Sequence, residues 1–488
     1  MRTPRSLSLI VCFWCVTGLL RADVKPGALF SDGAVLQREM PVPVWGTADE
    51  GEAVTVEFGG ASASTTAKDG KWMVKLPAMP ANASPQPLTI KGRNTVEIKD
   101  VLVGEVWMCS GQSNMAFTLA KASNGAEAVA SSANPMLHLF HVPTSMADKP
   151  AASVDASWQV SGPESAAAFS AVAYFFGRDL VRDLKVPVGL ILSAVGGTPA
   201  EAWTSNEALR AVPALKGIFD AQEKAEAEYP EKLRQFQEQA ANSDKKKRKP
   251  HPPKNPANMH RRPSGLFNAM IAPIIPYAIR GVIWYQGEAN RERTKEYQIL
   301  FPTTIADWRQ RWGLGDFPFL FVQISPNTRM VPELREAQLL TWKKTPNTAM
   351  AVTVDSGTAE SLLHSPLKEP VGDRLALAAQ ALAYGAKEEY SGPVYESVEI
   401  KGPQAVVKFS HAGGGLVARG GDLKGFIIAG ADRNFVPAEA RIEEGTIVVS
   451  SPQVSAPVAV RYGWASIPEG NLFNKEGLPA SPFRTDVE

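Results

Sequence analysis

The sequence predicts an α/β fold: a three-layer α/β/α domain with a parallel sheet, flanked by a smaller β domain on each side. Between residues 101 and 390, apolar runs that end in Gly, Ser, Gln or Asp alternate with patterns of helical periodicity. On either side, short alternating or β-rich runs are separated by Gly, Asp, Asn and Pro, as in antiparallel sheets. The chain of 488 residues, 44% of them apolar, is long enough for two or three such cores.

Composition limits the classes of partner. The formal charge of the chain is +1, which gives no long-range field. Binding to nucleic acid or to an anionic membrane surface is therefore not predicted.

The first 22 residues have the pattern of a secretory signal peptide. Arg2 and Arg5 precede an apolar run from Leu7 to Leu20, and Ala22 offers a cleavage position. A membrane anchor is the alternative, but the run is shorter than the ~20 residues that a span needs. We expect a secreted or periplasmic protein without stable membrane insertion after cleavage.

Residues 23–100 predict an N-terminal β domain. Its runs are separated by turn-forming residues, which is typical of a small antiparallel sandwich. The runs lie at 42–47, 53–60, 71–77 and 94–100. No catalytic role is expected here.

Residues 101–390 predict the central domain. Strands are expected within 187–197, 279–288, 317–325 and 347–357, and helices within 171–184, 296–312 and 372–385. Parallel strands deliver polar residues at their carboxyl ends, so the functional site is expected along that edge of the sheet.

Two further segments complete the organisation. Residues 221–263 read as a charged insertion that starts as a helix and contains the basic run Lys245–Lys249. A solvated loop is favoured over an anion-binding patch, and a cover over the site mouth stays open. Residues 391–488 predict a C-terminal β domain, for which packing against the central domain is favoured over glycan binding.

The most informative stretch runs from Val101 to Met115. It predicts a buried strand that ends in a tight turn and presents Ser113, a candidate nucleophile for acyl transfer. Gly111 permits close backbone approach, and the amides of Gln112 and Asn114 offer hydrogen-bond donors. Met115 stands where the second glycine of a G-x-S-x-G motif would be, which weakens an α/β-hydrolase assignment.

The segment GQSNM at 111–115 resembles the first block of the SGNH hydrolases, specifically the sialate O-acetylesterase-like carbohydrate esterases. Three more segments resemble the later blocks of that family in the expected order, namely SAVGGTPAEAW at 193–203, GLFNAMIAPIIPYAIRGVIWYQGEAN at 265–290 and HSPLKEPVGDRLALAAQ at 364–380. The resemblance implies a flavodoxin-like SGNH-hydrolase domain with serine esterase activity on acetylated sugars.

The general base is expected at His364. It lies in a loop between the strand ending at Asp355 and the next helix, where an α/β domain with the order serine then histidine would place it. The resemblance to the final block supports the same residue. The other histidines lie in a strand, in the insertion or in the C-terminal domain: His138, His141, His251, His260 and His411.

The group that orients His364 is not fixed by the sequence. Many SGNH enzymes carry an aspartate three residues before the histidine, but Ser361 holds that position here. Asp355, Glu288 and Glu360 are the candidate carboxylates, and a backbone carbonyl is the remaining alternative.

The resemblance also implies the oxyanion hole. The N–H of Ser113, the backbone at Gly196 and Gly197, and the side chain of Gln286 are expected to converge on one oxygen. Each such donor is typically worth about 10²–10³ in rate.

These observations predict an exported carbohydrate O-acetylesterase that works through an acyl-enzyme, with no cofactor and no metal. The expected substrates are O-acetylated sialic acid or an acetylated oligo- or polysaccharide such as acetylated xylan. A sialic acid carboxylate would favour a nearby arginine, for which Arg374, Arg261 and Arg262 are available. The alternative from another class is a catalytically inactive glycan-binding protein on the same scaffold.

Overall fold

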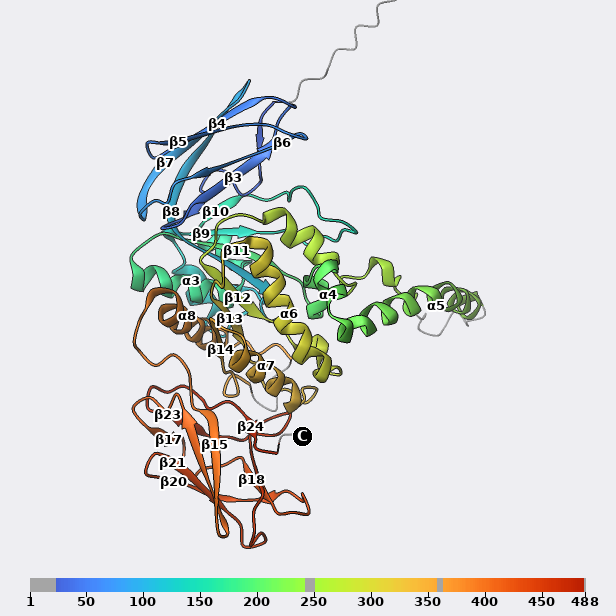
Figure 1. Cartoon of the computed structure of the whole chain (residues 1–488), viewed down its shortest axis with the longest axis vertical. Helices are drawn as coiled ribbons and strands as arrows, with labels where there is room; N and C mark the ends of the chain where they lie inside the picture. Colours follow the sequence, from blue (N-terminus) through green and yellow to red (C-terminus); the bar gives the residue numbers. More distant parts are fainter. Residues whose placement is uncertain (1–22, 242–250, 358–362, 487–488) are drawn as a thin grey trace, which may run out of the picture.

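The computed structural model describes residues 23–241, 251–357 and 363–486 (Figure 1). The expected signal peptide at 1–22, the basic run Lys245–Lys249 and the candidate Glu360 lie outside the described residues. No helix in the described part of the chain combines the length and apolarity needed to cross a membrane.

The predicted α/β class is confirmed. The central sheet has the strand order β10-β9-β11-β8-β12-β13-β14, in which every neighbouring pair is parallel except β10 with β9. Its strands are β10 (Trp158–Ser161), β9 (Asn134–His141), β11 (Val188–Ala194), β8 (Thr95–Gly111), β12 (Gly281–Tyr285), β13 (Phe319–Val322) and β14 (Thr348–Ala351). The β8, β11 and β12 segments inside the sheet are fully buried, which explains their continuous apolar sequences.

Helices cover both faces of this sheet. One face carries α3 (Ala171–Leu184) and α8 (Glu369–Tyr384), which pack on each other and on the strands through buried side chains such as Phe175, Phe176 and Leu375. The other face carries α6 (Thr294–Trp312) and α7 (Pro332–Lys344), with an aromatic core around Trp284, Phe301 and Trp308 (Figure 1). The shorter elements η1 (Leu119–Lys121), α1 (Gly125–Ala130), α2 (Pro163–Ala167), η2 (Ala200–Trp203), α4 (Asn206–Ala211) and η3 (Pro213–Leu215) fill the connections.

The strand order places three strand ends side by side. Gly111 at the end of β8 is aligned with Ala194 of β11 on one side and with Tyr285 of β12 on the other. The chain leaves β8 toward β9 and later returns to the opposite side as β12, so the order reverses at this point. Such a reversal is where open α/β sheets form their ligand sites.

The N-terminal β domain is continuous with the central sheet. Strand β8 pairs with β7 (Asn82–Lys91) and β2 (Val35–Gln37) in its first half and with β11 and β12 in its second half. The remaining strands are β1 (Lys25–Pro26), β3 (Val42–Thr47), β4 (Ala53–Phe58), β5 (Ala61–Thr66) and β6 (Lys71–Leu76). The expected boundary at residues 100 and 101 therefore falls inside one strand.

The C-terminal β domain packs on the α7 side of the central domain (Figure 1). The side chain of Arg335 in α7 is fully buried and donates to the carbonyls of Ala465 (2.8 Å) and Ser466 (2.9 Å). The strands of this domain are β15 (Val394–Lys401), β16 (Gln404–Ser410), β17 (Leu416–Ala418), β18 (Phe426–Ala429), β19 (Val436–Pro437), β20 (Glu439–Glu443), β21 (Thr446–Ser450), β22 (Ala459–Tyr462), β23 (Leu472–Asn474) and β24 (Phe483–Arg484).

The charged insertion begins as expected with a helix. This helix, α5, spans Lys216–Ala241 and projects away from the body of the molecule (Figure 1). Along its exposed length, ion pairs of i to i+3 and i to i+4 spacing link its charged side chains, for example Arg234 with Glu231 and Glu238. Such pairs support a solvated helix.

Candidate active site

The turn after β8 is shaped by Gly111. Its φ is +139°, a conformation that side chains rarely adopt, and a Cβ at this position would lie 2.2 Å from the carbonyl oxygen of Tyr285. The following residue donates its N–H to that same oxygen at 2.9 Å, and the N–H of Met115 closes the turn on the carbonyl of Gln112 at 2.9 Å. These contacts turn the chain so that Ser113 is partly exposed while its neighbours Gln112 and Asn114 are buried.

Ser113 meets His364 across the site. The distance from His364 Nε2 to Ser113 Oγ is 2.7 Å, although the two residues are 251 positions apart in the chain. His364 lies in the loop between β14 and α8, as the sequence predicts. This geometry allows the imidazole to accept the proton of the hydroxyl group, as a serine nucleophile requires.

The surroundings of His364 favour its neutral form. His364 is exposed overall, but its partial burial and then the nearby charge of Lys368 lower the pKa of His364 below its ordinary value of 6.5. A neutral imidazole can accept a proton, and an imidazolium cannot.

The backbone at the end of β11 lies beside Ser113. A Cβ built on Gly196 would be 3.4 Å from the Cβ of Ser113, and Gly197 has a left-handed φ of +73°. Among the described residues, no hydrogen bond uses the N–H of Ser113 or of Gly196. These two donors are therefore free to bind an oxygen of a ligand next to the serine.

The amide side chains expected near the oxyanion are used inside the protein. The Nε2 of Gln286 donates to Asn290 Oδ1 (2.7 Å) and to the carbonyl of Thr198 (3.3 Å), which takes both of its hydrogens. Gln112 is buried, and its Oε1 accepts from the N–H groups of Gly287 (3.5 Å) and Ala289 (3.3 Å). Both residues thus hold the loop that follows β12.

Neither described candidate carboxylate has a hydrogen bond to His364 among the residues that the structure covers. Both oxygens of Asp355 accept from Arg374, at 2.7 and 2.6 Å, so this carboxylate joins β14 to α8. Glu288 accepts from Asn114 at 2.6 Å instead, and burial raises the pKa of Glu288. Asn114 uses its second amide hydrogen on the carbonyl of Leu363 (3.2 Å), the residue before His364.

The structure adds one residue that the sequence did not suggest. Lys368 is 1% exposed, and its Nζ donates to Asn114 Oδ1 at 2.5 Å. Burial lowers the pKa of Lys368 to about 7, against the opposite effect of Glu288. A lysine just before a helix is usually solvated, so only its spacing of four residues from His364 could have pointed to it.

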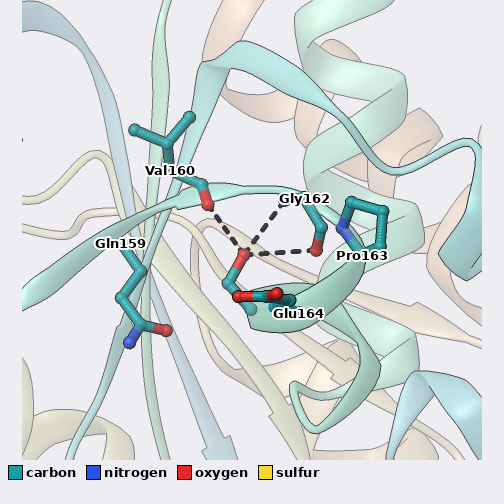
Figure 2. A pocket seen from close by; sticks show the side chains of 6 residues that line it. Gln159, Val160, Gly162, Pro163 and Glu164 are labelled. Atoms are coloured by element: carbon teal, nitrogen blue, oxygen red, sulfur yellow. Dashed lines mark hydrogen bonds between the residues drawn. The ribbon is translucent and has the colours of Figure 1, made fainter.

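A hollow at the edge of the sheet is separate from this site. Figure 2 shows it between β10 and the start of α2, lined by Gln159, Val160, Gly162, Pro163, Glu164 and Ser165. The hydroxyl of Ser165 donates to the carbonyl of Val160 (2.7 Å) and accepts from the N–H of Gly162 (3.0 Å). Strands β9 and β11 lie between β10 and β8, so this hollow is separated from the turn after β8. Ser165 lies in α2 and is, like Ser113, a half-buried serine.

Comparison with known proteins shows the family of the chain. The model of the family described as carbohydrate esterase, sialic acid-specific acetylesterase, matches residues 103–243 and 258–381. Sialate O-acetylesterase of Rattus norvegicus is 30% identical over 93% of this chain and 92% of its own length, and that of Homo sapiens is 29% identical over 95% and 94%.

A solved structure is also similar. The crystal structure of a carbohydrate acetylesterase from Xanthomonas citri has a TM-score of 0.84 and 37% identity, and the match covers 96% of this chain and all of that one. None of these comparisons supports the alternative of an inactive glycan-binding protein. The chain therefore belongs to the sialic acid-specific acetylesterase family of carbohydrate esterases, which are serine hydrolases of carboxylic esters.

Proposed function

We propose that this carbohydrate O-acetylesterase cleaves acetyl esters of sugars through an acetyl-enzyme formed on Ser113, with His364 as the general base. The observation that carries the proposal is the 2.7 Å contact between His364 Nε2 and Ser113 Oγ at the carboxyl edge of the sheet. The lowered pKa of His364 supports the assignment, because the base is then neutral near pH 7.

The reaction follows from this pair. Ser113 Oγ attacks the acetyl carbonyl carbon while its proton passes to His364 Nε2, and a tetrahedral intermediate forms. The intermediate collapses, the C–O bond to the sugar breaks, and the sugar oxygen takes the proton from His364. Water then attacks the acetyl group as His364 accepts its proton, and collapse returns that proton to Ser113 and releases acetate.

The oxyanion of the intermediate needs donors that are free before substrate binds. We assign this role to the N–H groups of Ser113 and Gly196, since no described hydrogen bond uses them. Gly197 supports the same turn with its left-handed backbone. Removal of one donor of this kind typically costs about 10²–10³ in rate.

For the sugar itself, we infer a preference for neutral acetylated saccharides over O-acetylated sialic acid. Arg374, the arginine closest in sequence to His364 that could bind a sialate carboxylate, is 9% exposed and donates to Asp355 and to the carbonyl of Val352. Arg262 is paired with Asp148. The mammalian relatives are named for sialate, whereas the Xanthomonas protein is named for carbohydrate without further specification.

Export through the first 22 residues is a further part of the proposal. The charged start followed by an apolar run supports a signal peptide. Expression of the full chain in a bacterium, with mass spectrometry of the periplasmic fraction, tests it: a mature protein that starts after Ala22 is expected. Unprocessed protein confined to the cytoplasm would contradict it.

The experiment that tests the activity measures acetate release from p-nitrophenyl acetate, acetylated xylan and O-acetylated sialic acid. Wild type is compared with Ser113→Ala, His364→Ala and the matched control Ser165→Ala, which removes another half-buried serine hydroxyl. We expect the first two variants to lose activity at least about a thousandfold and the control to keep it. Activity of Ser113→Ala close to that of wild type would refute the assignment of the nucleophile.

A further inference from the structure

Lys368 is a buried cation beside the reacting pair for which the chemistry above has no use. It stands four residues after His364 and directly before α8, and its side chain is 1% exposed. Burial of a lysine in this way is costly unless its ammonium group is hydrogen-bonded or paired. The structure must therefore compensate that cost locally.

The compensation comes from Asn114, the residue next to the nucleophile. Lys368 Nζ donates to Asn114 Oδ1 at 2.5 Å. The amide nitrogen of the same side chain donates to Glu288 Oε1 at 2.6 Å and to the carbonyl oxygen of Leu363 at 3.2 Å. One side chain thus connects the turn that carries Ser113, the loop after β12 and the loop that carries His364.

A lysine at this position fixes the orientation of the Asn114 amide. An ammonium group can only donate hydrogen bonds, so the amide oxygen of Asn114 must face Lys368, and the amide nitrogen then faces Glu288. In that orientation the second amide hydrogen reaches the Leu363 carbonyl. Without the ammonium group, the amide oxygen loses its donor and the orientation is no longer imposed.

The charges around this cluster are few. Glu288 faces Lys368 with a carboxylate whose Oε2 has no hydrogen-bond partner among the described residues, and His364 is the other titratable group that feels the ammonium charge. The rings of Phe117 and Tyr285 lie 5.0 and 5.3 Å from Lys368 Nζ. Aromatic faces at such distances attract a cation, which offsets part of the cost of burying the ammonium group.

We propose that Lys368 is a positioning residue of the esterase reaction: through Asn114 it fixes the position of the Ser113 turn relative to the His364 loop. Ser361 stands where an orienting aspartate is expected, and the tie from Asn114 to the backbone of Leu363 restrains the histidine loop instead. This inference rests on the proposed roles of Ser113 and His364. Its effect on rate should be large, because a misplacement of about 1 Å in such a pair can cost about 10²-fold.

The test compares Lys368→Met with the matched control Lys343→Met. Lys343 also donates its Nζ to a single oxygen, the carbonyl of Tyr395, but at the junction with the C-terminal domain. For Lys368→Met we expect kcat with p-nitrophenyl acetate to fall about 10- to 100-fold, with KM changed less than about threefold. Lys343→Met should keep the kcat of wild type.

The pH profile separates positioning from a general loss of stability. Removal of the charge of Lys368 takes away a group that disfavours the imidazolium form, so the pKa of His364 should rise. The acid limb of kcat/KM should then move to higher pH by about half a unit or more. The same limb in Lys343→Met should coincide with that of wild type.

Two results would overturn the inference. The first is a Lys368→Met enzyme with the kcat and pH profile of Lys343→Met. If Lys368→Met does not fold, the variant Asn114→Asp is tested in its place. An aspartate keeps the shape of Asn114 and the acceptor for Lys368 but lacks the donor to Leu363. The second overturning result is then a kcat of Asn114→Asp within about threefold of wild type. Failure of the proposed function looks different, because wild type itself would release no acetate.

Discussion

At the scale of single residues, the proposed site consists of the hydrogen-bonded pair Ser113 and His364 and a buried polar cluster beneath it. Ser113 and His364 face the solvent side, where a substrate can reach them, while Asn114, Glu288 and Lys368 are buried behind them. The side chains proposed to react are therefore different from the buried side chains proposed to hold them in place.

The acid limb of activity should reflect the lowered pKa of His364. The base must be neutral, so kcat/KM is low when His364 is protonated and rises with pH through its pKa. Because burial and Lys368 lower that pKa from 6.5, the midpoint is expected below pH 6.5. A pH profile measured with a neutral ester checks this, and a midpoint above 6.5 would contradict it.

Asp355→Asn should affect stability more than chemistry. Its carboxylate is paired with Arg374 at 2.6 Å, and the two side chains are only 26% and 10% exposed. Loss of the charge weakens the contact between β14 and α8, so we expect a destabilisation of about 1–3 kcal/mol and a kcat within about tenfold of wild type.

Denaturant unfolding and initial rates measure the two quantities on the same preparation. If Asp355 orients His364 as a triad acid, kcat should instead fall about 10⁴-fold. That outcome would contradict the pairing with Arg374 as the role of this residue.

The sequence singled out Ser113 and His364, which the structure brings together, but not the cluster behind them. Ser113 follows an apolar strand and His364 precedes a helix, and both positions carry recognisable chemistry. Lys368 and the inward use of Asn114 depend on contacts between segments about as distant as the pair itself, such as Asn114 with Leu363. Nothing in local sequence specifies such contacts, because lysine and asparagine are most often exposed.

At the scale of elements, β8 determines where the site lies. It brings the chain from the N-terminal domain through the middle of the central sheet and stops at Gly111, between the ends of β11 and β12. The fit around that glycine is tight on the side of β12. Its replacement is therefore a test of how the turn is built.

Gly111→Ala should damage both stability and activity. The backbone conformation at φ +139° costs about 1–3 kcal/mol for a residue with a Cβ, and that atom would overlap the Tyr285 carbonyl oxygen at 2.2 Å. We expect a clear fall in melting temperature and a loss of kcat, as the Ser113 turn must shift.

Gly313→Ala is a suitable control for this prediction. Gly313 also has a left-handed φ, of +65°, but a Cβ there would meet nothing within 4 Å. Thermal unfolding and initial rates are compared for the two variants. Equal effects of both changes would show that the contact with Tyr285 does not matter.

Element prediction succeeded where large apolar side chains recur along the segment. The helix expected at 171–184 has the bounds of α3. The helix expected at 296–312 lies within α6, and the one expected at 372–385 overlaps α8 and ends one residue after it. By contrast, α7 was not expected, because polar side chains such as Arg335 and Gln338 make up part of its buried face. A helix that buries hydrogen-bonded polar groups lacks the apolar stripe that reveals most helices.

At the scale of the whole molecule, the three parts are joined by buried polar contacts. Arg335 is fully buried and binds four carbonyl oxygens, those of Ile324 and Ser325 in the central domain and of Ala465 and Ser466 in the C-terminal domain. A hydrogen bond of 2.6 Å between the hydroxyl groups of Ser325 and Tyr285 connects this junction to the end of β12, which lies beside Gly111.

Arg335→Met should loosen this junction. The four carbonyls would lose their shared donor, and unsatisfied buried polar groups typically cost about 1–3 kcal/mol each. We expect calorimetry to show a lower melting temperature and a separate transition of the C-terminal domain. Arg441→Met, which removes an exposed arginine of the same domain, should unfold like wild type, and identical traces for both variants would contradict the expectation.

The proposed reaction requires that Ser113 carries an acetyl group during turnover. Rapid quenching of the enzyme during hydrolysis of p-nitrophenyl acetate, followed by peptide mass spectrometry, tests this directly. We expect one added acetyl group on the peptide that contains Ser113, and none on that peptide in Ser113→Ala. Undiminished acetate release by Ser113→Ala, or acetylation at another residue that turns over at the steady-state rate, would contradict it.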